Sequence, residues 1–424
     1  MEKKLVREKQ SNSEERRSNS EINDLPDPLL CHILSFLPTK DSVRSSLLSK
    51  RWRNLWLQVP VFDLDSRQLF DDGFSLTELV GRFLESDENL TLSRFKLICY
   101  SKDIDDDDDD SVLESWIDAL VGRRVCHLDF QVKSNDYELF FMPLSLYSCN
   151  TLASLSLCHV ALGDMELEFV VSLPCLKVMR LDSVRYEYDK SLIHHDESSS
   201  LETLITSCPV LEKLTIIRDF FDHLKIMRVR SRSLKSFTLW VDSYEVGLFE
   251  DHVVEIDAPR LEHMSLRDHL SGSIIIHSIA PYASVNIDVN FDGENGYTPL
   301  DEDDADSSKR TTIHDFLTRI STVCRMEISY HTLEVIHDYS KLERLPQFSK
   351  LTWLYASFLE SFGELLPTFL GCCPNLHTLV LKFQFEIEGC PIKLSYVPPC
   401  FVSSLEYVDC DTRHNKNIKP DEIS

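Results

Sequence analysis

The stretch "LPDPLLCHILSFL", Leu25–Leu37, carries apolar residues at helical spacing. Prolines are tolerated in the first turn of a helix, so Pro26 and Pro28 place the helix start at about Pro26. Pro38 ends the helix, because the residue before a proline disfavours helical dihedral angles. The pattern predicts an amphipathic helix with one wide apolar stripe. Five residues form that stripe: Leu29, Leu30, Ile33, Leu34 and Leu37.

Two more helices are expected directly after this one. Thr39 can cap the second helix, and Ser49 can cap the third, "KRWRNLW". In that third helix Trp52 and Trp56 are four residues apart, so they share a face and are expected to pack. Its basic residues are expected to form a solvated rim. Three helices of about 35 residues lie near the lower limit for a core that folds alone, so another element or partner must complete it.

From about residue 120 onward, short strand-like runs recur with apolar residues at positions 0, +3 and +5. The first two starts, Val125 and Leu152, are 27 residues apart, which falls within the roughly 20–29 residues of leucine-rich repeats. Positions +3 and +5 point to the same side of a strand, so each repeat adds to one continuous core. Nine runs follow in order, starting at Val125, Leu152, Leu176, Leu211, Leu234, Leu261, Val323, Leu351 and Leu376.

The repeats are predicted to be irregular. Position +8 lacks the Asn or Cys that most leucine-rich repeats place there, and "SVNIDVNF" (Ser284–Phe291) alternates like a strand without following the spacing. Two acidic inserts, "DIDDDDDD" (Asp103–Asp110) and "DEDDAD" (Asp301–Asp306), are expected to be solvated loops, because like charges repel. A calcium site of the EF-hand kind would need a glycine at its turn, which the first insert lacks.

The composition limits the classes of partner. With 70 acidic against 44 basic residues and a net charge of −26, the chain is not expected to bind nucleic acid, since that binding depends on Lys and Arg neutralising phosphates. The polar N-terminus does not resemble a signal peptide, and no apolar run is long enough for a membrane span. We therefore expect thirteen reduced cysteines, a location in the cytoplasm or nucleus, and no membrane association.

The segment Leu25–Trp56 as a whole, "LPDPLLCHILSFLPTKDSVRSSLLSKRWRNLW", resembles an F-box, and its ending is typical of the large plant-type families. "LPTFLGCCPNLHTLVL" (Leu366–Leu381) followed by "VPPCFVSSLEYVDC" (Val397–Cys410) resembles the FBD region found after the repeats in F-box/LRR/FBD proteins. Family members usually continue into a final amphipathic helix, whereas this chain continues into polar "DTRHNKNIKPDEIS".

The resemblance implies an α+β fold, in which a three-helix F-box precedes an irregular leucine-rich-repeat solenoid that ends in an FBD-like region. The corresponding division of the chain is a disordered tail (1–20), the F-box (21–60), the repeats (61–345), the FBD-like region (346–410) and a polar tail (411–424).

The resemblance also implies a function, that of the substrate-recognition subunit of an SCF-type E3 ubiquitin ligase. Such a subunit binds a Skp-type adaptor, and through it a cullin, while its repeats hold a protein target. The alternative is a scaffold whose repeats bind a partner without leading to its degradation. The residues expected to contact the adaptor are Leu25, Pro26, Leu29, Ile33, Leu34, Leu37, Val43, Leu47 and Trp52.

No catalytic, cofactor or metal site is predicted. Cys208 and Cys373 are interpreted as small buried thiols, because free cysteine behaves as a small apolar residue. Neither Cys372-Cys373 nor His194-His195 has a second pair at zinc-ligand spacing. The sequence also lacks the flanking signatures of phosphate-binding loops, metalloproteases and nucleophilic hydrolases. The chain is therefore expected to be a non-catalytic subunit.

Overall fold

The structure is a computed structural model. The residues that it describes are 20–69, 75–86, 90–100, 109–133, 140–162, 170–186, 200–219, 224–241, 252–291, 300, 307–358, 365–383 and 397–411. They divide into two compact units, Met1–Phe140 and Phe141–Ser424. This boundary falls inside the predicted repeat region rather than at the predicted end of the F-box.

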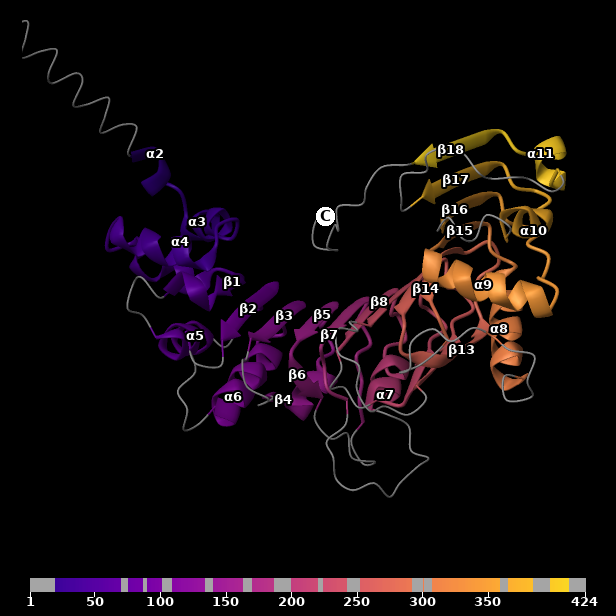
Figure 1. The fold of residues 1–424 in the computed structure, drawn as a ribbon. Helices are drawn as coiled ribbons and strands as arrows, with labels where there is room; N and C mark the ends of the chain where they lie inside the picture. The colour runs from indigo at the N-terminus through magenta and orange to yellow at the C-terminus, as the bar shows by residue number, and fades with distance from the viewer. Residues whose placement is uncertain are drawn as a thin grey trace, which may run out of the picture. The chain divides into compact units, whose positions relative to one another are not determined.

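The N-terminal unit combines short helices with the first parallel strands (Figure 1). Its described elements are α2 (Ser20–Asn23), α3 (Asp27–Leu34), α4 (Thr39–Arg44), the 3₁₀ helices η1 (Ser45–Leu47) and η2 (Trp52–Gln58), β1 (Val61–Asp65), η3 (Ser66–Leu69), α5 (Leu76–Leu84), β2 (Arg94–Tyr100), α6 (Asp109–Gly122) and β3 (His127–Lys133).

Strands β1, β2 and β3 pair in parallel in that order. Phe62 of β1 is in register with Phe95 of β2, and their rings stack at a centroid distance of 4.8 Å. Phe83 of α5 packs on Phe62 at 4.8 Å, so this helix covers the buried face of the first strand. Two repeats that the sequence analysis missed therefore begin here. They follow the same spacing and are buried: Val59, Phe62 and Leu64, then Leu92, Phe95 and Leu97.

The described part of the C-terminal unit contains ten strands of one parallel sheet, in which neighbours in the order below are paired. The order is β5-β7-β8-β10-β12-β14-β15-β16-β17-β18. These strands are β5 (Ser154–Cys158), β7 (Val178–Asp182), β8 (Lys213–Arg218), β10 (Ser236–Val241), β12 (His263–Asp268), β14 (Ser284–Val289), β15 (Arg325–Ile328), β16 (Trp353–Phe358), β17 (Thr378–Phe383) and β18 (Tyr407–Asp411).

The predicted repeat spacing is confirmed. In each of the nine predicted runs, the residues at positions 0, +3 and +5 are all buried. Ser284–Phe291 contains β14, whose Val285 and Ile287 are buried in the same core. Because the pairing register joins equivalent positions of neighbouring repeats, for example Leu239 of β10 with Leu266 of β12, the apolar pairs form continuous rows.

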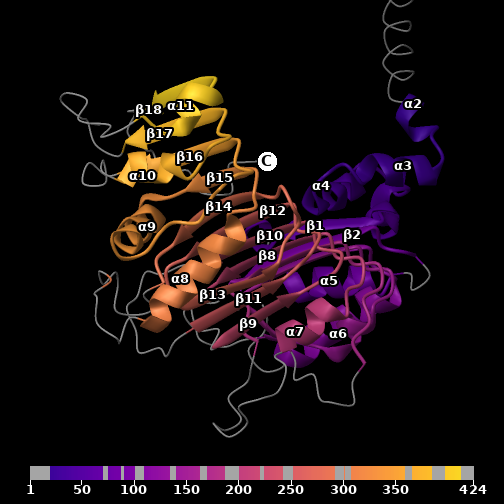
Figure 2. The same ribbon diagram turned by 90° about the vertical axis from the view of Figure 1, so that its right-hand side faces the viewer.

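A second sheet, which the sequence analysis missed, accompanies the middle repeats (Figure 2). Its parallel strands are β9 (Ile226–Arg230), β11 (His252–Asp257) and β13 (Ser271–Ser278), in the order β13-β11-β9. Each lies in the chain between two strands of the main sheet. The outer segments of these repeats are therefore extended, and Met227, Val254 and Ile274 bury their side chains in the core.

The remaining described elements are short or helical. They are β4 (Phe140–Met142), the 3₁₀ helix η5 (Leu144–Ser148), β6 (Val160–Leu162), α7 (Ser200–Thr206), α8 (Ser307–Ile320), α9 (Tyr330–Leu342), α10 (Leu365–Gly371) and α11 (Pro399–Ser403). The long interval between the runs at Leu176 and Leu211 contains a helix, α7. The FBD-like segment contributes β16, α10, β17, α11 and β18, which continue the repeat pattern to Asp411.

The prediction for the first acidic insert needs a correction. Asp109 and Asp110 are the first residues of α6 rather than part of a loop. The rest of this insert, residues 103–108, lies outside the described residues, as does the whole of the second insert, Asp301–Asp306. For those residues the loop assignment stays a prediction.

Candidate functional site

The apolar stripe predicted for the first helix divides into two ridges. Leu30 and Leu34 of α3 are almost completely buried. Leu29 and Ile33, one position before each of them, remain 49% and 41% exposed. Because residues four apart lie on one side of a helix, α3 presents one ridge to a core and a second ridge to solvent.

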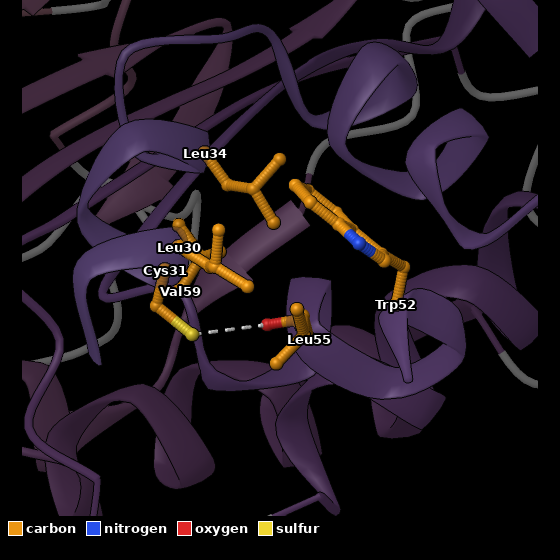
Figure 3. Close-up of a cluster of buried hydrophobic side chains, with 6 residues drawn as sticks. All are labelled: Leu30, Cys31, Leu34, Trp52, Leu55 and Val59. Carbon is orange, nitrogen blue, oxygen red and sulfur yellow. Dashed lines mark hydrogen bonds between the residues drawn. The ribbon is translucent and has the colours of Figure 1, made fainter. Parts of the chain in front are cut away.

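The buried ridge belongs to a small core between α3 and η2 (Figure 3). Its members are Leu30, Cys31, Leu34, Trp52, Leu55 and Val59, with Leu25 and Val61 packed against it. The Cys31 thiol donates to the carbonyl oxygen of Leu55 at 3.6 Å. Burial raises the pKa of this thiol, and the nearby Asp27 carboxylate raises it further. Cys31 therefore acts as an apolar packing residue.

The third predicted helix forms, but as a 3₁₀ helix. The tighter winding separates the two tryptophans that α-helical spacing would place on one face. Trp52 lies in the small core, and its Nε1 donates to Asn23 Oδ1 at 2.9 Å. Trp56 instead stacks on Phe83 of α5 at 6.2 Å. Both are packing residues, as predicted, but they join η2 to two different parts of the unit.

The basic residues of this segment are exposed, as predicted for a solvated rim, but Arg51 also makes specific hydrogen bonds. The Arg51 guanidinium donates to Asp27 Oδ1 and also to the backbone carbonyl oxygens of Asn23 and Leu25. Arg51 thereby holds the start of η2 to the start of α3. Lys50 and Arg53 are exposed, as the prediction had them.

Three side-chain hydrogen bonds fix the short second helix. Ser42 donates to the carbonyl oxygen of Leu34 at 3.1 Å, which joins α4 to α3. The hydroxyl oxygen of Thr39 accepts from the backbone N–H of Asp63 at 2.7 Å, which joins α4 to β1. Ser45 donates to the carbonyl oxygen of Ser42 at 2.6 Å where α4 passes into η1. The helices are thus anchored to the first strand of the repeats.

Apolar side chains remain exposed over α3, η1 and the turns that follow each of them. We call them the apolar surface, and they are Leu29, Ile33, Phe36, Leu37, Leu47 and Leu48. Phe36 and Leu47 are the most exposed, at 75% and 88%. Six large apolar side chains exposed within twenty residues are typical of a segment that binds another protein.

The predicted adaptor-binding residues fall into three groups. Leu29, Ile33, Leu37 and Leu47 belong to the apolar surface. Pro26 is exposed at the N-cap of α3, and Leu25 and Val43 are half-buried. Leu34 and Trp52 are buried in the small core, so the structure gives them a packing role and no exposed apolar area. Phe36 and Leu48, which lie beside predicted positions, are also exposed.

The cysteine interpretation is confirmed for the described part of the chain. Its twelve cysteines are all free, and Cys208 and Cys373 are buried. Burial raises the pKa of the Cys208 thiol to about 12. Burial also raises the pKa of Cys373 well above its ordinary value. Both thiols therefore stay protonated, which is unsuited to nucleophilic catalysis. His194 and His195 lie outside the described residues.

One group of possible metal ligands was not foreseen from the sequence. The structure brings together His269, Asp288 and His331, whose ligand atoms lie within 4.8 Å of one another. Asp288 is 19 residues from His269 and 43 from His331, which matches no short motif. Only the register of β12, β14 and β15 brings the three together.

Within the described ranges, every helix is too short or too polar to cross a lipid bilayer.

Comparison with known proteins identifies the family. The F-box domain model matches residues 22–64, and the model for the "FBD-associated F-box protein At5g56370, LRR repeats" matches residues 113–279. F-box/FBD/LRR-repeat protein At1g80470 of Arabidopsis thaliana is 46% identical over 390 residues, which cover 91% of this chain and 78% of that protein. F-box/LRR-repeat protein 13 of the same species is 43% identical over 390 residues, which cover 91% and 82%. The chain therefore belongs to the family of F-box/FBD/LRR-repeat proteins.

Proposed function

We propose that the protein is a substrate-recognition subunit of an SCF-type E3 ubiquitin ligase. F-box proteins serve in general as the substrate receptors of these ligases, and the F-box match covers α3, α4, η1 and η2. In this role the chain binds a Skp-type adaptor, and through it a cullin, while its repeats bind the target protein. The ubiquitin transfer itself is carried out by other subunits, so the chain is a non-catalytic subunit.

The observation that carries the proposal is the apolar surface. Its residues are exposed while the neighbouring Leu30 and Leu34 are buried, so the exposure is not the result of an unfolded segment. Each leucine or phenylalanine that a partner covers contributes about 1.5–3 kcal/mol of transfer free energy. The partner is therefore expected to supply an apolar groove, with polar groups around its rim.

Four of the predicted adaptor-binding residues have the exposure that direct contact requires: Leu29, Ile33, Leu37 and Leu47. Phe36 and Leu48 extend the same surface and are added to the proposed contacts. Leu34 and Trp52 act indirectly, because they hold α3 and η2 together. We therefore expect that replacing an exposed residue weakens adaptor binding but leaves the helices folded. Replacing a core residue is expected to unfold the helices and so to weaken adaptor binding as well.

The repeats supply the proposed target-binding surface. In each strand, the residues between the buried positions lie on the opposite face of the parallel sheet, where they are half-buried or exposed. Examples are Ser156, Thr215, Thr238, Ser265 and Thr378. The charges on this face are mixed, so the target is recognised by a particular arrangement of polar groups rather than by net charge.

The test is adaptor binding by a double variant of the apolar surface. Ile33→Gln with Leu47→Gln keeps side chains that suit helices but removes two apolar contacts. We expect adaptor affinity, measured by titration with purified Skp adaptor, to fall at least about tenfold. The matched control is Val170→Gln with Val402→Gln, two exposed valines of the C-terminal unit, which are 79% and 82% exposed. Equal affinity of both double variants and the wild type would contradict the proposal.

A further inference from the structure

Three polar side chains from three segments of the chain meet at the end of neighbouring strands. Asp288 lies near the end of β14, His269 follows β12 directly, and His331 lies in the first turn of α9. The paired register of β12 and β14 places Arg267 beside Asp288, so the next residues along β12 also reach this carboxylate. The three side chains are partly buried, at 20%, 20% and 31% exposure for His269, Asp288 and His331.

Both imidazoles face the same oxygen atom. His269 Nε2 and His331 Nδ1 each lie 2.9 Å from Asp288 Oδ1. Ser329, the N-cap of α9, also donates from Oγ to Oδ1 at 2.6 Å. One carboxylate oxygen offers about two lone pairs, so three donors exceed what Oδ1 accepts with good geometry. A cation at this point would bond to Oδ1 and to both imidazole nitrogens.

An ionised carboxylate and neutral imidazoles are the forms that bind metal ions. The rings of His269 and His331 are also in contact, with centroids 4.4 Å apart, so little rearrangement is needed to bring the nitrogens together.

We propose that His269, Asp288 and His331 form a binding site for a divalent transition-metal ion, with zinc as the best match. Zinc bonds to histidine nitrogen and aspartate oxygen at about 2.0–2.2 Å in tetrahedral geometry, which places its ligands about 3.3 Å apart. The separations here are 2.9 Å for both imidazole–carboxylate pairs and no more than 4.8 Å for the ligand atoms overall. Small rotations of the two rings therefore complete the site.

The site would have an open fourth position. Three protein ligands leave room for a water molecule or for a side chain of another protein. Asp288 belongs to the solvent-facing residues of β14, so the open position lies on the side of the sheet opposite the repeat core. Ser329 would orient the carboxylate from outside the coordination shell, as hydrogen-bonding partners of metal ligands commonly do. Metal binding here is independent of the proposed ligase function.

The charge of Arg267 is expected to lower the affinity of the site for a metal ion. Its Nε lies 3.7 Å from Asp288 Oδ2, and its guanidinium stacks over Trp240 at 4.6 Å. A positive charge so close to the carboxylate opposes the binding of a cation. Arg267→Met keeps an extended side chain over Trp240 but removes the charge, so it should tighten metal binding. Arg267 is not itself a ligand, so a purely structural role for the cluster does not predict this gain.

The experiment is a Co²⁺ titration of the full-length chain, reduced and freed of metal beforehand. Cobalt replaces zinc and reports its ligands: histidine and carboxylate give visible d–d bands, whereas cysteine thiolates add charge-transfer bands in the near ultraviolet. This matters because the chain has 13 cysteines and 15 histidines. We expect one equivalent of Co²⁺ with d–d bands and no thiolate band, displaced by Zn²⁺.

Variants distinguish Co²⁺ bound at the proposed site from Co²⁺ bound elsewhere on the chain. His269→Gln and His331→Gln should each lower the affinity for this Co²⁺ ion at least about 100-fold, and Ser329→Ala should lower it about tenfold. The matched control His263→Gln alters an exposed histidine of β12 and should leave binding unchanged. The proposal is overturned if the two ligand variants, shown to be folded by their melting curves, bind Co²⁺ like the wild type. It is also overturned if Arg267→Met weakens binding.

Discussion

Arg51, which precedes η2, binds Asp27 in the first turn of α3 through two guanidinium nitrogens. Nε lies 2.9 Å and Nη2 2.6 Å from Asp27 Oδ1. The same guanidinium donates to the carbonyl oxygens of Asn23 and Leu25. A planar guanidinium has five donors in a fixed arrangement, so one arginine can join a carboxylate and two carbonyl groups. This contact orients α3 relative to η2 and thereby positions the apolar surface.

Arg51→Ala should loosen the N-terminal helices. The pair is half-exposed, so the ion pair alone contributes little, but the backbone acceptors add to it. We expect a loss of about 1 kcal/mol in local stability, or roughly fivefold faster hydrogen exchange in peptides from α3. Arg53→Ala, at an exposed neighbouring position, is the control and should leave exchange unchanged. Equal exchange in the two variants would mean that Arg51 contributes no more than any surface arginine.

Leu30→Ala should unfold the helices around the small core. Leu30 is completely buried, and removing a buried leucine side chain costs about 2–5 kcal/mol. Because this core has only six members, the remaining contacts are not expected to keep the helices folded. We expect rapid tryptic cleavage between α4 and η2, whereas Leu48→Ala, at an exposed position, should be cleaved like the wild type.

Excess adaptor should distinguish this folding defect from a docking defect. A partner that binds only the folded helices stabilises them by mass action. Adaptor at high concentration should therefore restore protease resistance to Leu30→Ala. It should change the protease resistance of Ile33→Gln with Leu47→Gln little, because the fold of that variant is intact. If excess adaptor left Leu30→Ala as sensitive to protease as before, adaptor binding would not be coupled to the folding of these helices, which would contradict the proposal.

Burial of the Cys208 thiol predicts both slow alkylation and a particular pH dependence. Its pKa is raised from 9.0 to about 12, and Sγ donates to the carbonyl oxygen of Leu204 at 3.1 Å. Between pH 9 and 12 the folded chain keeps this proton while the unfolded chain releases it. The contribution to folding stability is therefore complete below about pH 9 and falls as the pH rises through this range.

The measurement is mass-spectrometric alkylation of the native chain at about pH 8, below the ordinary thiol pKa. The exposed Cys175 and Cys410 should react with iodoacetamide readily, and Cys208 should react only after urea unfolding. Cys208→Ala should weaken the loss of stability at alkaline pH, because the titrating group is gone. Reaction of Cys208 at the rate of Cys175 in the native chain would show that α7 opens readily.

The apolar spacing predicted the strands of the main sheet, because side chains along a strand alternate between its buried and its exposed face. Phe237 and Leu239 are two residues apart, so both point to one core in any parallel sheet of this kind. The runs at Val59 and Leu92 fit the same spacing and are buried, so the same rule extends to the strands before residue 120. The outer strands β9, β11 and β13 follow no comparable rule, since a repeat's outer segment is a helix, a loop or a strand.

The candidate sites show where sequence reasoning ends. The helical pattern of α3 identified its apolar residues but not which ridge is buried, because that depends on how η2 packs against it. Arg51 is exposed as predicted, but its hydrogen bonds were not foreseen, because its acceptors, at Asn23 and Asp27, lie 28 and 24 residues away along the chain. The cluster around Asp288 is similarly joined only by strand register, which short motifs do not record.

Target turnover separates the ligase receptor from a non-degradative scaffold. Deleting residues 1–60 would also remove Trp56 from Phe83 and Thr39 from its bond with Asp63, so a shortened chain confuses lost docking with a damaged first repeat. Ile33→Gln with Leu47→Gln avoids this, because both side chains are exposed.

In a receptor, this variant holds the target without delivering it to the ligase, so overexpression should lengthen the target's half-life. A cycloheximide chase on the best-enriched non-adaptor partner measures this, with Val170→Gln plus Val402→Gln as control. A half-life that is the same for wild type and variant, with and without a proteasome inhibitor, would favour the scaffold.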